Sequence, residues 1–240
     1  MILLRNHTNL ESLEMSDYTI KIITEDMVED VMDFIWKNFF PDEPLTRSLE
    51  LKPGFLVDTW CKPHIASGYS LAAVDPQGEL LGVRLGKILT SSDWKERFMD
   101  TNYVAKKTFL AIAWFTKACT NANTLILLKD KIGYDVWEFM DRVKSKKVYE
   151  ALLICTKKEG RQRGLGTELV AKSLELAKEH SCEYMYVFVT GNYSAKIFDK
   201  LEFGCEGEQR YDEFVDTDGK PLLKDTREHI KAQLRIKKIE

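Results

Sequence analysis

Apolar residues recur at helical spacing in the first quarter of the chain. Between Met27 and Phe40 they form two neighbouring rows with a spacing of four residues, which predicts an amphipathic helix. Thr24 is a suitable N-cap residue for this helix, and Pro41 ends it. Residues 18–23 alternate between apolar and polar side chains, and we expect a strand there.

Two short apolar runs follow, at residues 69–74 and 80–85. Between them lies Asp75-Pro76-Gln77-Gly78, in which proline at the second position and glycine at the fourth suit a type I turn. This pattern predicts a hairpin. Residues 92–147 are rich in lysine, methionine and aromatic residues at helical spacing, and we expect helices there with a loop near residues 121–123.

The second half of the chain alternates between apolar runs and amphipathic segments. Residues 148–156 are almost continuously apolar, with Glu150 as the one interruption, and predict a buried central strand. The later elements that we expect are a basic loop over residues 157–166, helices over 167–180 and 194–201, and strands over 184–190, 205–215 and 222–240. This order of elements indicates an α/β fold.

The chain shows neither a linker-like segment nor an internal repeat over its 240 residues, so a division into two domains is not favoured. We expect one domain over residues 18–240, with the helical segment at about 92–147 as an insertion. The polar residues 1–17 predict a loose N-terminal arm.

Charge and cysteine content narrow the classes of function. The 35 basic and 38 acidic residues give a net charge of −3, which argues against a nucleic-acid binder that acts through overall charge. No apolar run of the sequence reaches the length of a membrane span. The five cysteines are an odd number at scattered positions, as expected for free thiols in the cytoplasm. Cys61 and His64 have no second ligand pair nearby, so we expect no metal site.

The segment Arg161-Gln162-Arg163-Gly164-Leu165-Gly166-Thr167 carries the clearest chemical signal, because it joins the buried strand to a helix. A helix N-terminus presents free N–H groups, glycine lets an anion approach the backbone, and the arginines add positive charge. Together these features indicate a phosphate or pyrophosphate site. The P-loop and dinucleotide patterns both fail, because leucine stands where each requires a glycine. A basic capped loop without a ligand is the alternative.

The pattern Arg-x-x-Gly-x-Gly after a buried strand resembles the acetyl-coenzyme A loop of the GNAT superfamily of N-acetyltransferases. Ser194, Phe198, Leu201 and Phe203 also lie where that superfamily shows Asn-x-x-Ala-x-x-x-Tyr-x-x-Leu-Gly-Phe. Phe198 stands at the position of a tyrosine that protonates the departing thiolate in many members. A phenyl ring has no such proton, so the resemblance leaves that role without a residue.

Two further segments, Asp42-Glu43-Pro44-Leu45 and Tyr193-Ser194-Ala195, are similar to segments of insect arylalkylamine N-acetyltransferases. Tyr211 to Phe214 resembles the Tyr-x-x-Tyr of that group, with phenylalanine at the second position. A helical insertion before the coenzyme strand is also usual in the group. The resemblance covers about residues 18–215 in order.

The resemblance implies a three-layer α/β GNAT fold, with a mixed, mostly antiparallel sheet and helices on both faces. It implies acetyl-CoA as cosubstrate, without a metal, and direct transfer of acetyl to a primary amine in a ternary complex. An arylalkylamine such as dopamine, tyramine or serotonin is the implied substrate. A polyamine or agmatine acetyltransferase and a non-catalytic coenzyme A sensor are the alternatives. We expect no nucleic acid or membrane as a partner, and a monomer or weak dimer.

Glu43 is the candidate general base. An alkylamine has a pKa of about 10 and is mostly protonated at neutral pH, so a carboxylate suits the removal of its proton. Pro44 favours an extended conformation at Glu43, and the apolar residues nearby would desolvate the carboxylate. The alternative is a solvated turn residue without a chemical role.

The resemblance implies three more catalytic candidates. Ser194 orients the coenzyme sulfur or relays a proton to it, with a first-turn hydroxyl that only satisfies the backbone as the alternative. Tyr193 is a candidate proton donor, and Thr190 stands where the group often has another hydroxyl.

The expected coenzyme contacts come from the basic loop and the strand before it. N–H groups of the loop and its arginines would hold the pyrophosphate, and the strand edge would pair with the pantetheine amides and offer an N–H group to the oxyanion. The residues concerned are Ile154, Cys155, Thr156, Arg161, Gln162, Arg163, Gly164, Leu165, Gly166 and Thr167.

Overall fold

The computed structural model describes residues 18–52, 55–93, 117–158, 161 and 164–240. Within these residues, seven strands form one sheet in the order β1-β2-β3-β4-β5-β7-β6. Their bounds are Thr19–Ile22 (β1), Leu71–Val74 (β2), Leu80–Thr90 (β3), Lys147–Thr156 (β4), Tyr184–Val189 (β5), Gly204–Arg210 (β6) and Lys231–Lys238 (β7).

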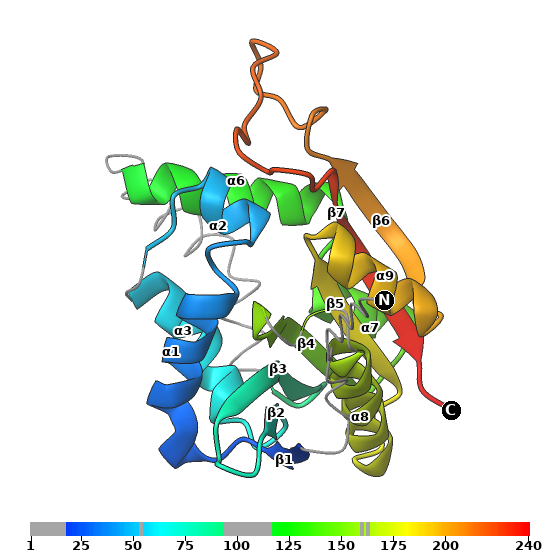
Figure 1. Cartoon of the computed structure of the whole chain (residues 1–240). Coiled ribbons are helices and arrows are strands. Elements are labelled where there is room, and N and C mark those ends of the chain that lie inside the picture. Colours follow the sequence, from blue (N-terminus) through cyan, green and yellow to red (C-terminus); the bar gives the residue numbers. More distant parts are fainter. Residues whose placement is uncertain (1–17, 53–54, 94–116, 159–160, 162–163) are drawn as a thin grey trace, which may run out of the picture.

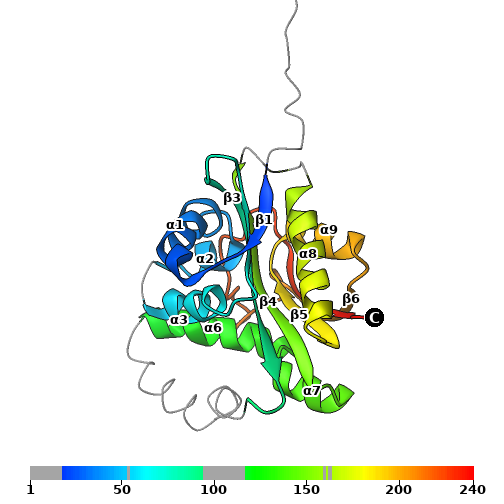
Figure 2. The same cartoon turned by 90° about the horizontal axis from the view of Figure 1, so that it is seen from below.

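Helices cover both faces of this sheet (Figures 1 and 2). On one face lie α1, α2, α3 and α6, and on the other lie α8 and α9. The short helix α7 packs against Val148 of β4 and Tyr186 of β5. The bounds are Glu25–Met27 for the 3-10 turn η1, Val28–Asn38 (α1), Pro44–Ser48 (α2), Phe55–Ile65 (α3), Lys117–Lys131 (α6), Val136–Val143 (α7), Leu165–Glu179 (α8) and Asn192–Lys200 (α9).

The pair β4 and β5 is parallel, and the other pairs are antiparallel. The pairing of β4 with β5 runs from Val148 opposite Tyr184 to Ala151 opposite Val187, and it stops there. β4 continues to Thr156 along β3, with a register shift opposite Leu85 and Gly86. The last five residues of β4 therefore keep one neighbouring strand within the described sheet, and the opposite edge of the strand is open.

These observations confirm the expected α/β class, with a mixed, mostly antiparallel sheet between two helical layers. They also confirm the amphipathic first helix, the hairpin, the buried strand and the helix after the basic loop. In the hairpin turn, Gly78 has a φ of +85° and its N–H donates to the carbonyl oxygen of Asp75 at 2.9 Å. Thr24 precedes the 3-10 turn η1 and not α1, and its side chain makes no capping hydrogen bond.

Four expectations were wrong or incomplete. The strand expected over residues 205–215 ends at Arg210. The loop expected near residues 121–123 is absent, because α6 runs through these positions. The last strand begins at Lys231 and not at residue 222, since residues 222–230 form a connection that packs Leu223 against Leu45 and Tyr211. Helices α2 and α3 were not expected at all. Residues 94–116 of the expected insertion and the arm at 1–17 lie outside the described residues.

The close approach of β6 to the residue after α6 can be tested by replacing a glycine with alanine. A Cβ atom on Gly207 of β6 would lie 2.2 Å from the carbonyl oxygen of Ile132, which follows α6. A Cβ atom on Gly204 of the same strand would meet Ile236 O at an ordinary 3.6 Å. We expect Gly207→Ala to lower the free energy of unfolding by about 1–3 kcal/mol and Gly204→Ala to change it by less than about 0.5 kcal/mol. Urea unfolding of both variants measures this, and equal effects would contradict the packing described here.

Candidate functional site

The basic loop enters α8 through a left-handed glycine. Gly164 is the N-cap residue of α8 and has a φ of +86°, a conformation that costs energy for residues with a Cβ atom. Gly166 follows in the first turn, where a Cβ atom would meet Ile197 of α9 at 3.0 Å. Leu165 is buried, and Thr167 lies beside it in the same turn. The first N–H groups of α8 have no partner within the helix, and this turn lies beside β4, because the same Cβ atom on Gly166 would be 3.5 Å from Ile154 Cδ1.

Arg161 ties the loop to the segment between α1 and α2. Its guanidinium donates to Asp42 Oδ2 and to the carbonyl oxygen of Asn38, each at 2.7 Å. Arg227 donates to the other carboxylate oxygen of Asp42 at 3.0 Å. Burial alone would raise the pKa of Asp42, but the hydrogen bond and charge of Arg161 outweigh it, and the pKa is lowered. Gln162 and Arg163 lie outside the described residues.

Glu43 is next to this junction, and its carboxylate is buried. The residue is extended (φ −76°, ψ 123°) and is the N-cap of α2, where its Oε2 accepts a hydrogen bond from Thr46 N at 2.5 Å. Only 8% of Glu43 is exposed, so it is not a solvated turn residue. The next residue but one, Leu45, packs against Tyr211 and Phe214 from the connection between β6 and β7.

Tyr211 links Glu43 to the end of β5. Its hydroxyl donates to the carbonyl oxygen of Thr190 at 2.6 Å. Burial and the charge of Glu43 raise the pKa of Tyr211 well above its usual value, so the phenol keeps its proton at neutral pH. The structure thus brings together Glu43, Thr190 and Tyr211, which come from three distant parts of the sequence.

The first turn of α9 is held by the connection between β6 and β7. Ser194 Oγ donates to Gly191 O at 2.9 Å, which is the backbone role named above as its alternative. Tyr193 is 63% exposed, and its ring packs edge-to-face on His229. A hydrogen bond to Glu228 and the charge of that residue raise the pKa of Tyr193. The N–H of Asn192 donates to His229 Nδ1 at 3.1 Å.

A buried ionic cluster lies where β4 and β5 part. Glu150 accepts a hydrogen bond from Tyr134 at 2.9 Å, and its other oxygen is 3.5 Å from His64 Nε2 and 3.7 Å from Lys87 Nζ. Burial would raise the pKa of Glu150, but His64, Lys87 and Tyr134 together lower it to about 2. No role was predicted for Glu150 from the sequence, although a single carboxylate within an apolar strand could have marked it as a buried ionic residue.

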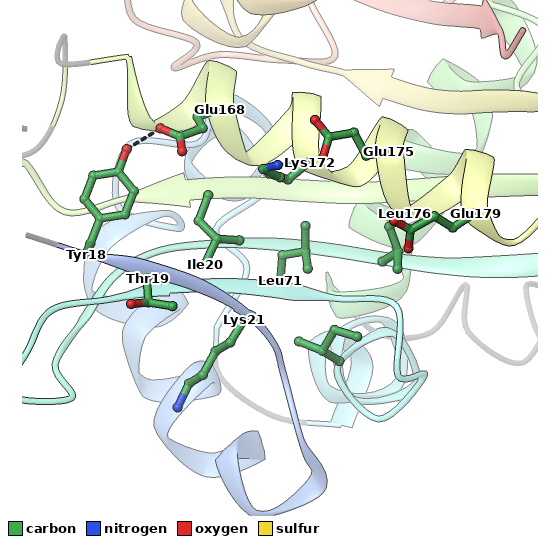
Figure 3. Close-up of a pocket in the computed structure, with 11 residues that line it drawn as sticks. Tyr18, Thr19, Ile20, Lys21, Leu71, Glu168, Lys172, Glu175, Leu176 and Glu179 are labelled. Atoms are coloured by element: carbon green, nitrogen blue, oxygen red, sulfur yellow. Dashed lines mark hydrogen bonds and ion pairs between the residues drawn. The ribbon is translucent and has the colours of Figure 1, made fainter. Parts of the chain in front are cut away.

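A groove of about 500 Å³ lies elsewhere, between the edge strand β1 and α8 (Figure 3). Tyr18 donates a hydrogen bond to Glu168 at one end of it, and Lys21 and Lys172 stand along it. None of the candidate residues above lines this groove, so we assign it no chemistry. Among the described residues, no group of His, Cys, Asp and Glu side chains gathers as metal ligands would. None of the described helices is long and apolar enough to cross a bilayer.

The sequence matches the acetyltransferase (GNAT) family over residues 29–203. Arylalkylamine N-acetyltransferase 2 from Aedes aegypti is 21% identical, with a TM-score of 0.78 over 93% of this chain and 99% of that chain. A Drosophila melanogaster polyamine N-acetyltransferase that forms N-acetylagmatine is 15% identical, with a TM-score of 0.74 over 92% and 100%. The mosquito protein named arylalkylamine N-acetyltransferase like 5b is 18% identical, with a TM-score of 0.71 over 92% of this chain and 99% of that chain. These structures confirm the expected GNAT fold.

The cluster around Glu150 predicts a loss of stability in acid. Because its pKa in the folded chain is about 2 against an ordinary 4.5, the unfolded state takes up a proton first as the pH falls. The stabilisation is complete above about pH 4.5 and disappears toward pH 2. We expect Glu150→Gln to be less stable than the wild type by about 2 kcal/mol or more at pH 7, and the difference to shrink below pH 4.5.

Urea unfolding at several pH values between 7 and 3 measures this difference. Glu175→Gln, on the exposed side of α8, is the control and should follow the wild type. A difference between Glu150→Gln and the wild type that stays constant with pH would contradict the description of the cluster.

Proposed function

Because the chain belongs to the acetyltransferase (GNAT) family, we propose that it transfers the acetyl group of acetyl-CoA directly to an arylalkylamine such as dopamine, tyramine or serotonin. The observation that carries this proposal is the buried carboxylate of Glu43, which follows Asp42, the partner of Arg161 from the basic loop, and whose charge acts on Tyr211. It combines an acceptor for the amine proton with an apolar wall for an aromatic ring.

The described residues fit acetyl-CoA, which supplies the reactive thioester. Backbone N–H groups from Gln162 to Thr167 would hold the pyrophosphate, and the side chains of Arg161 and Arg163 would add positive charge. The open edge of β4 at Ile154, Cys155 and Thr156 would pair with the pantetheine amides. An N–H group at this edge would also receive the oxyanion.

Glu43 would accept the proton of the ammonium group, directly or through a water molecule. The neighbouring Asp42 is already paired with Arg161 and Arg227, so Glu43 is the carboxylate left for a cationic substrate. Burial excludes much of the water around it and strengthens its attraction for the ammonium group. The free amine nitrogen then attacks the thioester carbonyl carbon.

The roles proposed for the other candidates follow from their places. Ser194 and Thr190 flank the start of α9, where they would orient the coenzyme sulfur, and Tyr193 is the exposed hydroxyl that would exchange protons with water. Burial raises the pKa of Cys155 to about 12. A thiol with that pKa is a poor nucleophile at neutral pH, which supports direct transfer and not an acetyl-cysteine route.

Glu43→Gln tests the general base with little change in shape, because the amide oxygen still accepts the hydrogen bond from Thr46. We expect kcat to fall by about 100-fold or more, while coenzyme affinity stays unchanged. The measurement is thiol release with a panel of arylalkylamines, polyamines and agmatine, with the exposed Glu213→Gln as control. Unchanged turnover would refute the role of Glu43. Turnover of polyamines alone would favour the alternative substrate class, and coenzyme binding without thiol release from any amine would favour a sensor.

Alanine substitutions at two glycines with nearly the same φ distinguish the effect of backbone strain on stability from an effect on coenzyme binding. Gly164 and Gly78 have φ values of +86° and +85°, and a Cβ atom on either would meet nothing within 4 Å. We expect alanine at either position to cost about 1 kcal/mol of stability. We expect only Gly164→Ala to weaken acetyl-CoA binding in calorimetry, by about tenfold or more. Equal affinities for the two variants would contradict the assignment of this turn to the pyrophosphate.

A further inference from the structure

Arg84 of β3 is a buried cation without an anionic partner in the described part of the chain. Its exposed fraction is 0%, and its Nη1 donates to the carbonyl oxygens of Leu153 at 3.0 Å and Leu85 at 3.2 Å. Its Nε and Nη2 are buried and find no hydrogen-bond partner among the residues that the structure describes. Buried charges are normally paired, because an unpaired one is costly. Burial lowers the pKa of Arg84 to about 10, so the guanidinium is still charged at neutral pH.

This cation lies at the opening between β4 and β5. Arg84 is paired in register with Ile154, and its acceptor Leu153 comes two residues after Ala151, the last residue of β4 that pairs with β5. The guanidinium is thus attached to the part of β4 whose other edge is open. The pantetheine arm would run along the same edge, so the thioester would come close to Arg84.

The ring of Phe198 lies on the same side. Its centroid is 6.0 Å from Cζ of Arg84, and the residue is buried in α9. The resemblance to the GNAT superfamily also implies that Phe198 stands where many members carry the tyrosine that protonates the departing thiolate. A positive charge therefore stands near the place where the ordinary proton donor is missing.

We propose that Arg84 binds the sulfur of coenzyme A as a thiolate, through Nε and Nη2, the two nitrogens for which the described residues provide no acceptor. This inference rests on the proposed function, because it needs the thioester to lie along β4. When the C–S bond breaks, its electron pair stays on sulfur, next to the guanidinium. The amine nitrogen gives up its protons by way of Glu43 to solvent, and the thiolate takes a proton from water after it leaves.

The groups around Arg84 leave this role to it. Tyr149 is the titratable side chain that interacts electrostatically with Arg84. Its hydroxyl donates a hydrogen bond to Tyr69 O at 2.7 Å. Ser194, which we propose to orient the sulfur, and the mostly exposed Tyr193 carry uncharged hydroxyl groups, so neither supplies a positive charge to a thiolate. Since Arg84 already meets two carbonyl oxygens through Nη1, a purely structural role would leave Nε and Nη2 unexplained.

The experiment is a titration of coenzyme A bound to the protein, followed by thiolate absorbance in the ultraviolet. The complex with desulfo-coenzyme A, which lacks the thiol, serves as the blank and removes the signal of the protein's own cysteines. A free thiol has a pKa of about 8.5. We expect the pKa of the bound thiol to be lower by about one unit or more in the wild type, as is usual next to a cation. We expect the free value in Arg84→Met and a partial lowering in Arg84→Lys.

Arg235→Met is the matched control. Arg235 is also a buried arginine, but it is paired with Asp199 at 2.8 Å and bonded to Gln233 and Phe203 O. We expect this variant to lose stability and to keep the low pKa of the bound thiol. We expect Arg84→Met to keep its stability, because it removes a buried charge without an ionic partner.

Two results would overturn the inference. A thiol pKa that is not lowered in the wild-type complex would do so without any variant, and so would a lowered pKa that persists in folded, coenzyme-binding Arg84→Met. In both cases the proposed function would still stand, provided that the protein binds coenzyme A. If calorimetry shows that the wild type does not bind coenzyme A at all, the proposed function fails and the inference fails with it.

Discussion

The candidate site depends on one structural feature, the separation of the parallel strands β4 and β5 after Ala151 and Val187. Backbone N–H and C=O groups inside a protein need partners, and beyond this point β4 offers its free edge to a ligand. A register shift between β3 and β4 lies at the same level, opposite Leu85 and Gly86. The ionic cluster of Glu150 stands just before the separation and Arg84 just after it, so charged groups are gathered where the sheet opens.

The chemistry beside this opening is assembled from segments that are far apart in the sequence. Helix α2 positions Glu43, the end of β5 supplies Thr190, and the connection between β6 and β7 supplies Tyr211 and His229. Asp42 holds the basic loop to the same place through Arg161, and it holds the connection between β6 and β7 through Arg227. Since exposed ion pairs contribute little to stability, the value of this junction lies in position. It keeps a buried carboxylate next to the turn that would bind the pyrophosphate.

Local periodicity was enough to predict α1, β4, α8 and the hairpin at Gly78, because each has a clear apolar pattern and a turn or cap residue. It failed for α6, where the asparagines of residues 121–123 suggested a loop. The helix continues because Leu128 and Ile132 pack into the core further along, and tertiary packing outweighs local propensity. Glu43 was chosen as a candidate through its motif, but the effect of its charge on Tyr211 joins residues too far apart in the sequence for any local pattern to predict. Arg84 looks like an ordinary polar position of a hairpin strand, and its burial depends on tertiary packing near Phe198 of α9, which the local sequence does not report.

The proposed mechanism requires that the free edge of β4 and the first turn of α8 hold acetyl-CoA. Amide hydrogen exchange, followed by mass spectrometry with and without acetyl-CoA, tests this claim most directly. With acetyl-CoA bound, we expect slower exchange than in the free protein for peptides that contain Ile154 to Thr156 and the start of α8, because these N–H groups gain hydrogen-bond partners on binding. Protection confined to other parts of the chain, with these peptides exchanging as fast as in the free protein, would contradict it.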